Sequence, residues 1–284
     1  MTGSAEGKIA IVTGAASPIG LGHAMAQALV QAGAKVALCD VNEAWLDESV
    51  HAMEAIGGAG CALGIPLDVT EPDSVDGAVS RTIEAFGTVH ILVNNAGINQ
   101  RSEGFVNQER SPFWELTPAQ WERVVDVNLN GPFFMTRAAI QPMLDQKWGR
   151  IISVTTSMDT MWRKYGSPYG PSKAGHEALV ATMAGELEDT GVTANVLVPG
   201  GATYTNMTTH GHDFDTEKMI PASVMQAPVV WLASDASSDF NGQRIIGYFW
   251  DEELPIAERL EKASAPAAWP QLGRQAIVPG PPPS

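Results

Sequence analysis

Short runs of β-branched and apolar residues alternate with longer helical patterns along most of the chain, and this alternation is the feature that most constrains the fold. A run such as Lys8–Thr13 is almost wholly apolar, as expected for a strand buried on both faces. Parallel strands need crossover connections, which are usually helices and almost always right-handed. We therefore predict an α/β fold, with a doubly wound, mostly parallel, seven-stranded sheet and helices on both faces. The predicted strands span residues 8–13, 35–40, 61–67, 89–94, 150–155, 192–198 and 243–249, and the predicted helices span 19–32, 43–56, 72–86, 118–145, 169–189 and 222–233.

The length and composition fit one large domain. The 284 residues are 44% hydrophobic, which is enough for a sizeable core, and the sequence contains no internal repeat. We place a single domain at residues 1–254 and a C-terminal extension at 255–284, which is rich in Ala and Pro. The formal net charge of −15 argues against nucleic acid and against an anionic membrane as partners, because both attract basic surfaces.

Cysteine and histidine usage indicates neither a disulfide framework nor a metal centre. Cys39 and Cys61 lie in apolar runs and are expected to be buried and reduced. The six histidines lack a convincing ligand spacing, although His210 and His212 form a short pair in a predicted loop. The N-terminus has no apolar signal-peptide core, and no apolar run is long enough to span a membrane. We therefore expect no metal and a cytoplasmic location.

A glycine-rich turn follows the first predicted strand directly and leads into the first predicted helix. Such a turn exposes backbone N–H groups that bind phosphate, and its first glycine permits the tight bend. Asp40 ends the second predicted strand, where a carboxylate binds the hydroxyls of an adenine ribose and repels a 2′-phosphate. We therefore predict a Rossmann-type site for NAD rather than NADP. The predicted contacts in the turn are Gly14, Ser17, Ile19 and Gly20.

Tyr169 and Lys173 are four residues apart in a predicted helix, so their side chains share one helix face. A lysine ammonium favours the phenolate, and we expect Lys173 to lower the pKa of Tyr169 below its usual value of about 10. A tyrosine tuned in this way can act as a general acid or base. The same spacing also occurs on solvated helix faces, so the pair gains weight only from the other motifs.

Taken together, the motifs are those of one family. Over about residues 7–250 the chain resembles the short-chain dehydrogenase/reductases, which are NAD(P)-dependent oxidoreductases. The residues that carry the resemblance are Thr13-Gly14 to Gly20, Asp68-Val69, Asn94-Asn95-Ala96-Gly97, Asn128, Thr156-Ser157, Tyr169 to Lys173 and Pro199-Gly200.

The resemblance implies a role for each matching residue. Tyr169 would be the catalytic acid or base, Lys173 would hold the nicotinamide ribose, and Asn128 would hold a water that links Lys173 to solvent. A hydroxyl after the fifth strand would orient the substrate oxygen. Asp68 and Val69 would flank the adenine. The remaining implied cofactor contacts are Asn95, Ala96, Gly97, Pro199 and Gly200.

Two departures from the family pattern concern the site itself. Pro18 replaces the middle glycine of the turn, and proline fixes φ and removes an N–H donor. The family's serine lies 13 residues before the tyrosine, a position occupied here by Thr156, while Ser157 lies 12 residues before it. The local context Thr-Ser-Met favours Ser157 as the catalytic hydroxyl, with Thr156 as the alternative.

Two further departures lie outside these motifs. The loop after Gly97 is longer than the family norm, and the C-terminus continues past Trp250 into a tail that contains Trp269. We expect this tail either to be an exposed extension or to dock over a substrate cleft, its own or that of a neighbouring subunit.

The expected substrate is an apolar or aromatic secondary alcohol or ketone, because loops near the site carry many aromatic residues. Asp159, Arg163 and Lys164 suggest a sugar or polyol dehydrogenase as the alternative, and a non-catalytic dinucleotide-binding sensor is the other class. The family resemblance implies a homodimer or homotetramer. The side chains expected to line the pocket are Phe105, Phe113, Trp114, Trp162, Tyr204, Met207 and Phe214.

Overall fold

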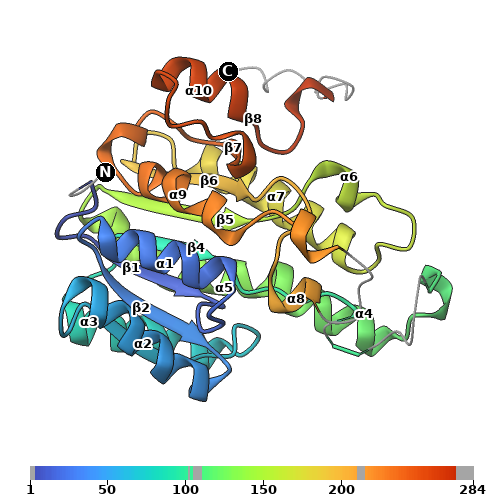
Figure 1. Ribbon diagram of the computed structural model, residues 1–284, viewed down its shortest axis with the longest axis horizontal. Helices are drawn as coiled ribbons and strands as arrows, with labels where there is room; N and C mark the ends of the chain where they lie inside the picture. The colour runs from blue at the N-terminus through green and yellow to red at the C-terminus, as the bar shows by residue number, and fades with distance from the viewer. Residues whose placement is uncertain (1–3, 102, 105–110, 210–214, 273–284) are drawn as a thin grey trace, which may run out of the picture.

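The computed structural model describes residues 4–101, 103–104, 111–209 and 215–272, and within them the chain folds around one eight-stranded sheet (Figure 1). The strand order is β3-β2-β1-β4-β5-β6-β7-β8, and all neighbouring pairs are parallel except β7 and β8. The strands are β1 Ile9–Thr13, β2 Lys35–Asp40, β3 Ala62–Pro66, β4 Ile91–Asn94, β5 Gly149–Val154, β6 Val192–Val198, β7 Gln243–Ile246 and β8 Ser264–Pro266.

Helices cover both faces of the sheet, which confirms the predicted fold class. The α-helices are α1 Leu21–Gln31, α2 Glu43–Gly57, α3 Pro72–Phe86, α4 Pro118–Val125, α5 Gly131–Asp145, α6 Met158–Met161, α7 Tyr169–Glu186, α8 Asn206–Thr209, α9 Gln226–Leu232 and α10 Ile256–Ala263. The shorter helices are η1 Phe113–Glu115, η2 Asp126–Asn130, η3 Thr216–Lys218, η4 Ala222–Met225, η5 Asp235–Ser237, η6 Gly247–Phe249 and η7 Pro270–Leu272; of these η2 is a π-helix and the others are 3-10 helices.

The apolar character of the first strand follows from these two layers. Ala10 and Val12 contribute to the cluster formed with α1, α2 and α9, whereas Ile11 contributes to the cluster formed with α3, α5 and α7. Since successive side chains of a strand point to opposite faces, a strand covered on both sides must be apolar at every position. β1 lies between β2 and β4, so the chain winds outward in both directions from this point, where doubly wound sheets bind their ligands.

The C-terminal extension supplies the eighth strand, so the prediction of seven strands was wrong by one. β8 pairs with β7 through the register Arg244↔Ala265, and α10 lies beside it at the same edge of the sheet (Figure 1). The guanidinium of Arg259 lies over the Trp250 ring, 5.1 Å from its centroid, and Ala263 and Ala267 are buried. The described part of the tail therefore covers a sheet edge and does not line the chain's own cleft.

Several predicted boundaries also differ from the structure. The predicted last strand ends at Ile246 rather than residue 249, because Gly247–Phe249 forms η6. The predicted helix 118–145 divides into α4, the π-helical η2 and α5, and the predicted helix 222–233 divides into η4 and α9. α5 begins at Gly131 with Pro132 in its first turn, where the missing N–H of proline is tolerated.

Candidate active site

A cleft of about 1040 Å³ opens at the carboxyl ends of the strands, on both sides of the switch point between β1 and β4. It brings together most of the residues predicted for the cofactor and for catalysis. Of the remaining three, Asn128 is buried behind the cleft, and Ile19 and Gly200 adjoin residues that line it. The predicted residues that line the cleft are Gly14, Ser17, Gly20, Asp40, Asp68, Val69, Asn95, Ala96, Gly97, Ser157, Tyr169, Lys173 and Pro199.

The glycine-rich turn is packed too tightly for side chains at two positions. Gly14 has a φ of +63°, and a Cβ there would lie 2.8 Å from the Cα of Ala96. A Cβ on Gly22, in the first turn of α1, would lie 2.3 Å from the carbonyl oxygen of Gly14. Asn95 also fixes the position of the turn, because its Nδ2 donates to the carbonyl oxygens of Thr13 and Gly14, at 2.9 Å each. These contacts bring the start of α1 against the end of β1.

Pro18 fits the turn. The N–H of Gly20 donates to the carbonyl of Ser17 at 2.8 Å, which places Pro18 second in a four-residue turn, where its fixed φ is favourable. Gly20 is extended, with φ −82° and ψ 155°, and serves as the N-cap of α1. The helix therefore begins at Leu21, two residues later than predicted.

Asp40 ends β2, Asp68 lies two residues after the neighbouring β3, and both line the cleft. Asp40 accepts from the backbone N–H groups of Ala16, at 3.0 Å, and Asn42, at 3.1 Å, so its position is tied to the glycine-rich turn. Asp68 accepts from the N–H of Thr70 at 2.9 Å and from its hydroxyl at 2.7 Å. The arrangement places an oriented acid where an adenine ribose would lie in a dinucleotide site of this kind.

Lys173 is almost completely buried beneath the cleft. Its side chain lies on α7, is 3% exposed and donates from Nζ to the carbonyl of Val154 at 2.8 Å. Burial lowers the pKa of Lys173 from 10.5 to about 8, because the charged form loses its hydration. Tyr169 begins the same helix one turn earlier.

The expected lowering of the pKa of Tyr169 by Lys173 is wrong for this structure. Burial raises the pKa of Tyr169, and hydrogen bonding to the side chain of Thr156 offsets part of that rise. Lys173 is not among the causes that shift the pKa of the phenol. The phenol is therefore protonated at neutral pH, and the pair is suited to giving a proton to a substrate oxygen.

Asn128 lies in the π-helical turn η2, completely buried. Its Oδ1 accepts from the N–H of Ile98 at 2.9 Å, and its Nδ2 donates to the carbonyl of Ile98 at 2.9 Å and to Ser172 Oγ at 3.0 Å. A Cβ on Gly97 would lie 3.2 Å from Asn128 Oδ1 and 3.3 Å from Lys173 Nζ. Asn128 thus ties the loop after β4 to α7, and π-turns of this kind are frequent at functional sites.

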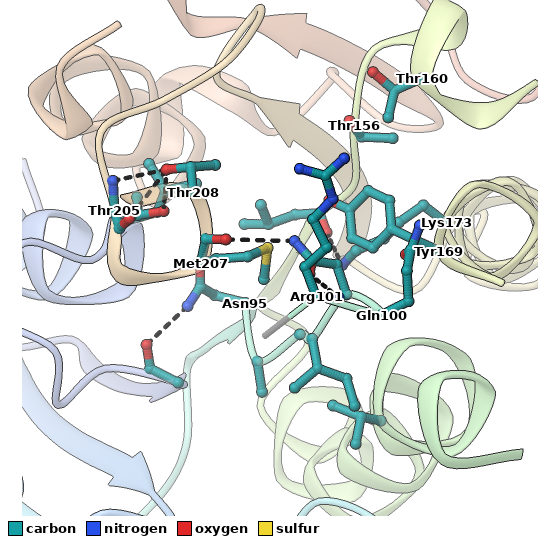
Figure 2. A pocket seen from close by; sticks show the side chains of 18 of the residues that line it. Asn95, Gln100, Arg101, Thr156, Thr160, Tyr169, Lys173, Thr205, Met207 and Thr208 are labelled. Carbon is teal, nitrogen blue, oxygen red and sulfur yellow. Dashed lines mark hydrogen bonds between the residues drawn. The ribbon is translucent and has the colours of Figure 1, made fainter. Parts of the chain in front are cut away.

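The two candidate hydroxyls point to different partners. The side chain of Thr156 interacts with that of Tyr169 and lowers the pKa of the phenol, and Figure 2 shows both side chains at the same part of the cavity. The Ser157 hydroxyl pairs with the Thr160 hydroxyl at 2.8 Å, and Ser157 is the N-cap residue of α6. Both Thr156 and Ser157 line the cleft, so both stay candidates for the catalytic hydroxyl, and the interaction with Tyr169 leads us to propose Thr156 below.

Among the described residues, the aromatic side chains expected to line the cleft lie outside it. Phe113, Trp114 and Trp162 are 70%, 73% and 63% exposed, and none of them lines it. Tyr204 is also outside the lining, whereas Met207 belongs to it. Phe105 and Phe214 lie outside the described residues, as do His210 and His212.

Polar and basic side chains occupy that part of the wall instead. Figure 2 shows the guanidinium of Arg101 extending toward Thr156 and the ring of Tyr169. Arg163 and Lys164 also line the cleft, while Asp159 does not, and Arg123 is paired with Glu103 at 3.4 Å. Among the described lining residues, the carboxylates are those of Asp40 and Asp68, at the ends of β2 and β3. Several of the described residues that line the cleft near Tyr169 are therefore basic, in a strongly acidic protein.

Two sets of hydrogen bonds near the site were not predicted from the sequence. The Thr13 hydroxyl accepts from the N–H groups of Asn95 and Ala96, at 3.0 Å each, which binds the end of β1 to the end of β4. The segment after Pro199 crosses to the glycine-rich turn, where Asn206 Nδ2 donates to Ser17 Oγ at 3.0 Å. The position of Thr13 at the end of a strand is a sequence signal for its hydrogen bonds. No sequence pattern indicates the hydrogen bond between Asn206 and Ser17.

Neither a metal nor a membrane segment is found in the part of the chain that the structure describes. No three His, Cys, Asp or Glu side chains gather there as metal ligands would. No described helix combines the length and apolar character needed to cross a membrane. Cys39 and Cys61 are buried and unbonded to each other, and burial raises the pKa of the Cys39 thiol to about 12.

Comparison with known proteins identifies many relatives. The family model described as short chain dehydrogenase matches residues 8–215. The "Short chain dehydrogenase/reductase astE" of Aspergillus oryzae is 35% identical over 256 residues, covering 85% of this chain and 94% of its own. The 3beta-hydroxysteroid dehydrogenase 1 of Eggerthella lenta is 34% identical over 252 residues, covering 84% and 90%. The crystal structure of a "putative gluconate dehydrogenase" from Agrobacterium tumefaciens superposes with a TM-score of 0.75 at 30% identity, covering 86% and 94%.

Proposed function

The chain belongs to the short-chain dehydrogenase/reductase family, and from this premise we propose that it is an NAD-dependent oxidoreductase that interconverts a secondary alcohol and a ketone. The observation that carries the proposal is the convergence of Tyr169, Lys173 and the Thr156 hydroxyl in one cleft with a glycine-rich turn and Asp40. Tyr169 is the proposed general acid or base. A binding module without catalysis would not need a buried lysine beneath this tyrosine.

The residues of the cleft fit a nicotinamide dinucleotide. Gly14 and Gly22 allow a close backbone approach at the start of α1, where free N–H groups favour a diphosphate. Asp40 would accept from the adenine ribose, Asp68 and Val69 would flank the adenine, and Lys173 would hold the nicotinamide ribose. When bound, the nicotinamide supplies the hydride acceptor or donor. Within the family, the carboxylate at Asp40 supports NAD over NADP.

Residues of the chain itself would transfer the proton to or from the substrate oxygen. Hydride transfer to a ketone leaves negative charge on the substrate oxygen, and hydroxyl donors aimed at that oxygen stabilise it. Thr156 would orient the oxygen, and Tyr169 would give it a proton. Burial raises the pKa of Tyr169, so the phenol keeps its proton at neutral pH and ketone reduction is the direction that this state favours. In alcohol oxidation the same phenol, once deprotonated, accepts the proton.

The cleft wall favours a polar, acidic substrate over the apolar or aromatic one expected from the sequence. Arg163 and Lys164 line the cleft and would attract a carboxylate. A hydroxy acid or sugar acid is therefore our second candidate, related to the sugar and polyol alternative. The likeness to a "putative gluconate dehydrogenase" and to the D-beta-hydroxybutyrate dehydrogenase of Rhizobium meliloti, 34% identical over 195 residues, is consistent with it.

We also propose that the chain assembles as a homodimer or homotetramer, as the resemblance to the family implies. Trp121 on α4 and Phe133 on α5 are 42% and 46% exposed, and apolar side chains of this size are commonly covered in assemblies. Light scattering of the purified chain measures the molar mass directly, and a monomer at micromolar concentration contradicts this part of the proposal.

A substrate panel tests the activity. The purified chain is mixed with NAD and, in separate reactions, with cyclohexanol, 1-phenylethanol, 3-hydroxybutyrate and gluconate, and the reduced cofactor is followed by absorbance. We expect turnover with at least one alcohol, faster with the acids than with the neutral alcohols. Tyr169→Phe should abolish that turnover while NADH still binds, because only the proton-handling hydroxyl is removed.

The results that contradict the proposal are distinct. NADH binding with no turnover across the panel supports the non-catalytic sensor instead. Turnover with NADP at a higher kcat/KM than with NAD contradicts the role of Asp40. Retention of activity in Tyr169→Phe contradicts the assignment of the acid and base.

A further inference from the structure

The end of β5 and the two residues that follow it are held by three charged side chains. Each charged side chain contacts a different residue of this short segment, which carries the Thr156 hydroxyl. Lys173 Nζ donates to the Val154 carbonyl at 2.8 Å, Glu177 Oε2 accepts from Thr155 Oγ1 at 2.9 Å, and Arg244 Nη2 donates to the Thr156 carbonyl at 2.9 Å.

Glu177 and Arg244 also contact each other. Arg244 Nε lies 3.4 Å from Glu177 Oε1, and the side chains are 7% and 0% exposed. These two atoms have no further hydrogen-bond partner in the described structure, and their own contact is an ion pair rather than a well-aligned hydrogen bond. The pair joins α7 to β7 across the segment that holds Thr156.

A buried ion pair is poorly explained by stability alone. Removing two charges from water carries a large penalty, and apolar replacements of similar volume are often as stable. The pair is therefore better explained by its contacts with Thr155 and Thr156, whose positions it fixes. Glu177 lies one helical turn beyond Lys173, so a single helix carries the acid or base, the lysine and this anchor.

We propose that Glu177 and Arg244 are positioning residues that hold the Thr156 hydroxyl toward Tyr169. Glu177 fixes the Thr155 side chain and Arg244 fixes the Thr156 carbonyl, so the backbone on both sides of the Thr156 Cα is restrained. Displacement of a reacting group by about 1 Å can lower a rate by about 100-fold, which makes such restraint valuable. The inference rests on the proposed function, because it assigns the substrate-orienting role to Thr156.

The competing explanation is a purely structural role, and the chain offers a matched control. Arg150 is also buried, at 1% exposed, and lies at the opposite end of the same strand. Its Nε donates to the Ser234 carbonyl at 3.2 Å and its Nη1 to the Gly149 carbonyl at 2.8 Å, and it does not line the cleft. Arg150→Lys therefore disturbs a buried cation on β5 without touching Thr156.

A double-mutant cycle on the full chain separates the two explanations. Glu177→Gln keeps an acceptor for Thr155 but removes the charge opposite Arg244. It is combined with Thr156→Ala, and kcat is measured with NAD and the panel alcohol of highest kcat/KM. We expect Glu177→Gln to lower kcat about tenfold in the parent chain and less than about twofold in Thr156→Ala, because the restrained group is then absent. Arg150→Lys should lower Tm and leave kcat within about twofold.

Each outcome decides one point. Equal losses of kcat from Glu177→Gln in both backgrounds overturn the positioning role and leave a structural one. Unchanged turnover in Thr156→Ala overturns the hydroxyl assignment of the proposed function instead, and a parent chain that turns over no panel alcohol overturns the proposed activity. If Glu177→Gln fails to fold, Arg244→Lys keeps a buried cation while shortening the reach to Thr156, and the same non-additivity is expected.

Discussion

The buried lysine beneath the cleft gives the sharpest quantitative prediction. Lys173 is 3% exposed and its pKa falls from 10.5 to about 8 in the folded protein because of burial. A difference of one in pKa corresponds to about 1.4 kcal/mol, so burying the charged form costs about 3 kcal/mol relative to the neutral form. Lys173→Met removes the charge at similar volume, so we expect the variant not to carry the free-energy cost of burying a charged side chain.

The dependence of the free energy of unfolding on pH follows from whether the folded or the unfolded state holds the Lys173 proton at a given pH. Between about pH 8 and 10.5 the folded protein has lost the Lys173 proton while the unfolded chain still holds it, so stability rises with pH in this window. Below pH 8 both states are protonated and the contribution is at its lowest. The free energy of unfolding of the parent chain should therefore rise by about 3 kcal/mol relative to Lys173→Met from pH 7 to pH 10.5.

At pH 7 itself the two proteins should differ little. The methionine variant loses the hydrogen bond to the Val154 carbonyl, which costs about 1–3 kcal/mol when the acceptor stays buried. This loss offsets most of the gain from removing the charge. We expect the unfolding free energies to agree within about 2 kcal/mol, while the variant loses turnover.

Urea unfolding of the parent chain and of Lys173→Met at several pH values measures the difference between their free energies of unfolding. Groups other than Lys173 titrate in both proteins, so their contributions cancel in this difference. Lys218→Met removes an ammonium whose side chain is 83% exposed and serves as the control for loss of a lysine charge. A difference between the parent chain and Lys173→Met that stays constant from pH 7 to pH 10.5 would refute the reasoning, because Lys173 would then titrate alike in both states.

Three further predictions concern the cofactor site and the tail. Gly22→Ala should destabilise the protein by about 1–3 kcal/mol and weaken NADH binding, because the new Cβ would lie 2.3 Å from the Gly14 carbonyl oxygen. Gly77→Ala, in the open interior of α3, should instead stabilise by about 0.5–1 kcal/mol, and thermal unfolding compares the two. Asp40→Ala should raise the Kd for NADH by about 10- to 100-fold and leave the Kd for NADPH unchanged or lower; equal losses for both cofactors, measured by fluorescence titration, would contradict the role of the carboxylate. Removing residues 255–284 should lower Tm, because β8 is lost from the edge of the sheet, yet leave KM for substrate and cofactor within about twofold, and a large rise in KM would show that the tail serves the cleft.

Features carried by local sequence were predicted well. The alternation of apolar runs and helical patterns identified β1 to β7 because strands covered on both faces must be apolar throughout, as Ala10, Ile11 and Val12 are. The turn at Gly14 and the carboxylate at Asp40 were found because their roles depend on their place after a strand. β8 was missed because Ser264–Pro266 has no strand pattern and forms only by pairing with β7.

The chemistry of the site depended more on distant contacts. The spacing of Tyr169 and Lys173 determines that they share a helix face, but burial by neighbouring elements sets their pKa values, so Lys173 does not lower the pKa of Tyr169. The spacing alone left Thr156 and Ser157 as alternatives, and only the folded chain shows that Thr156 affects the pKa of the phenol while the Ser157 hydroxyl pairs with that of Thr160.

The sequence by itself therefore determined the fold class, the family resemblance and the residues that meet at the carboxyl ends of the strands. Only the tertiary structure decided the direction of the pKa shifts, the basic residues that line the cleft, and the contacts of Glu177 with Thr155 and of Arg244 with the Thr156 carbonyl. The physical reason is that hydration and hydrogen-bond partners are set by residues far apart in the chain; Glu177 and Arg244 are brought together only when α7 packs beside β7.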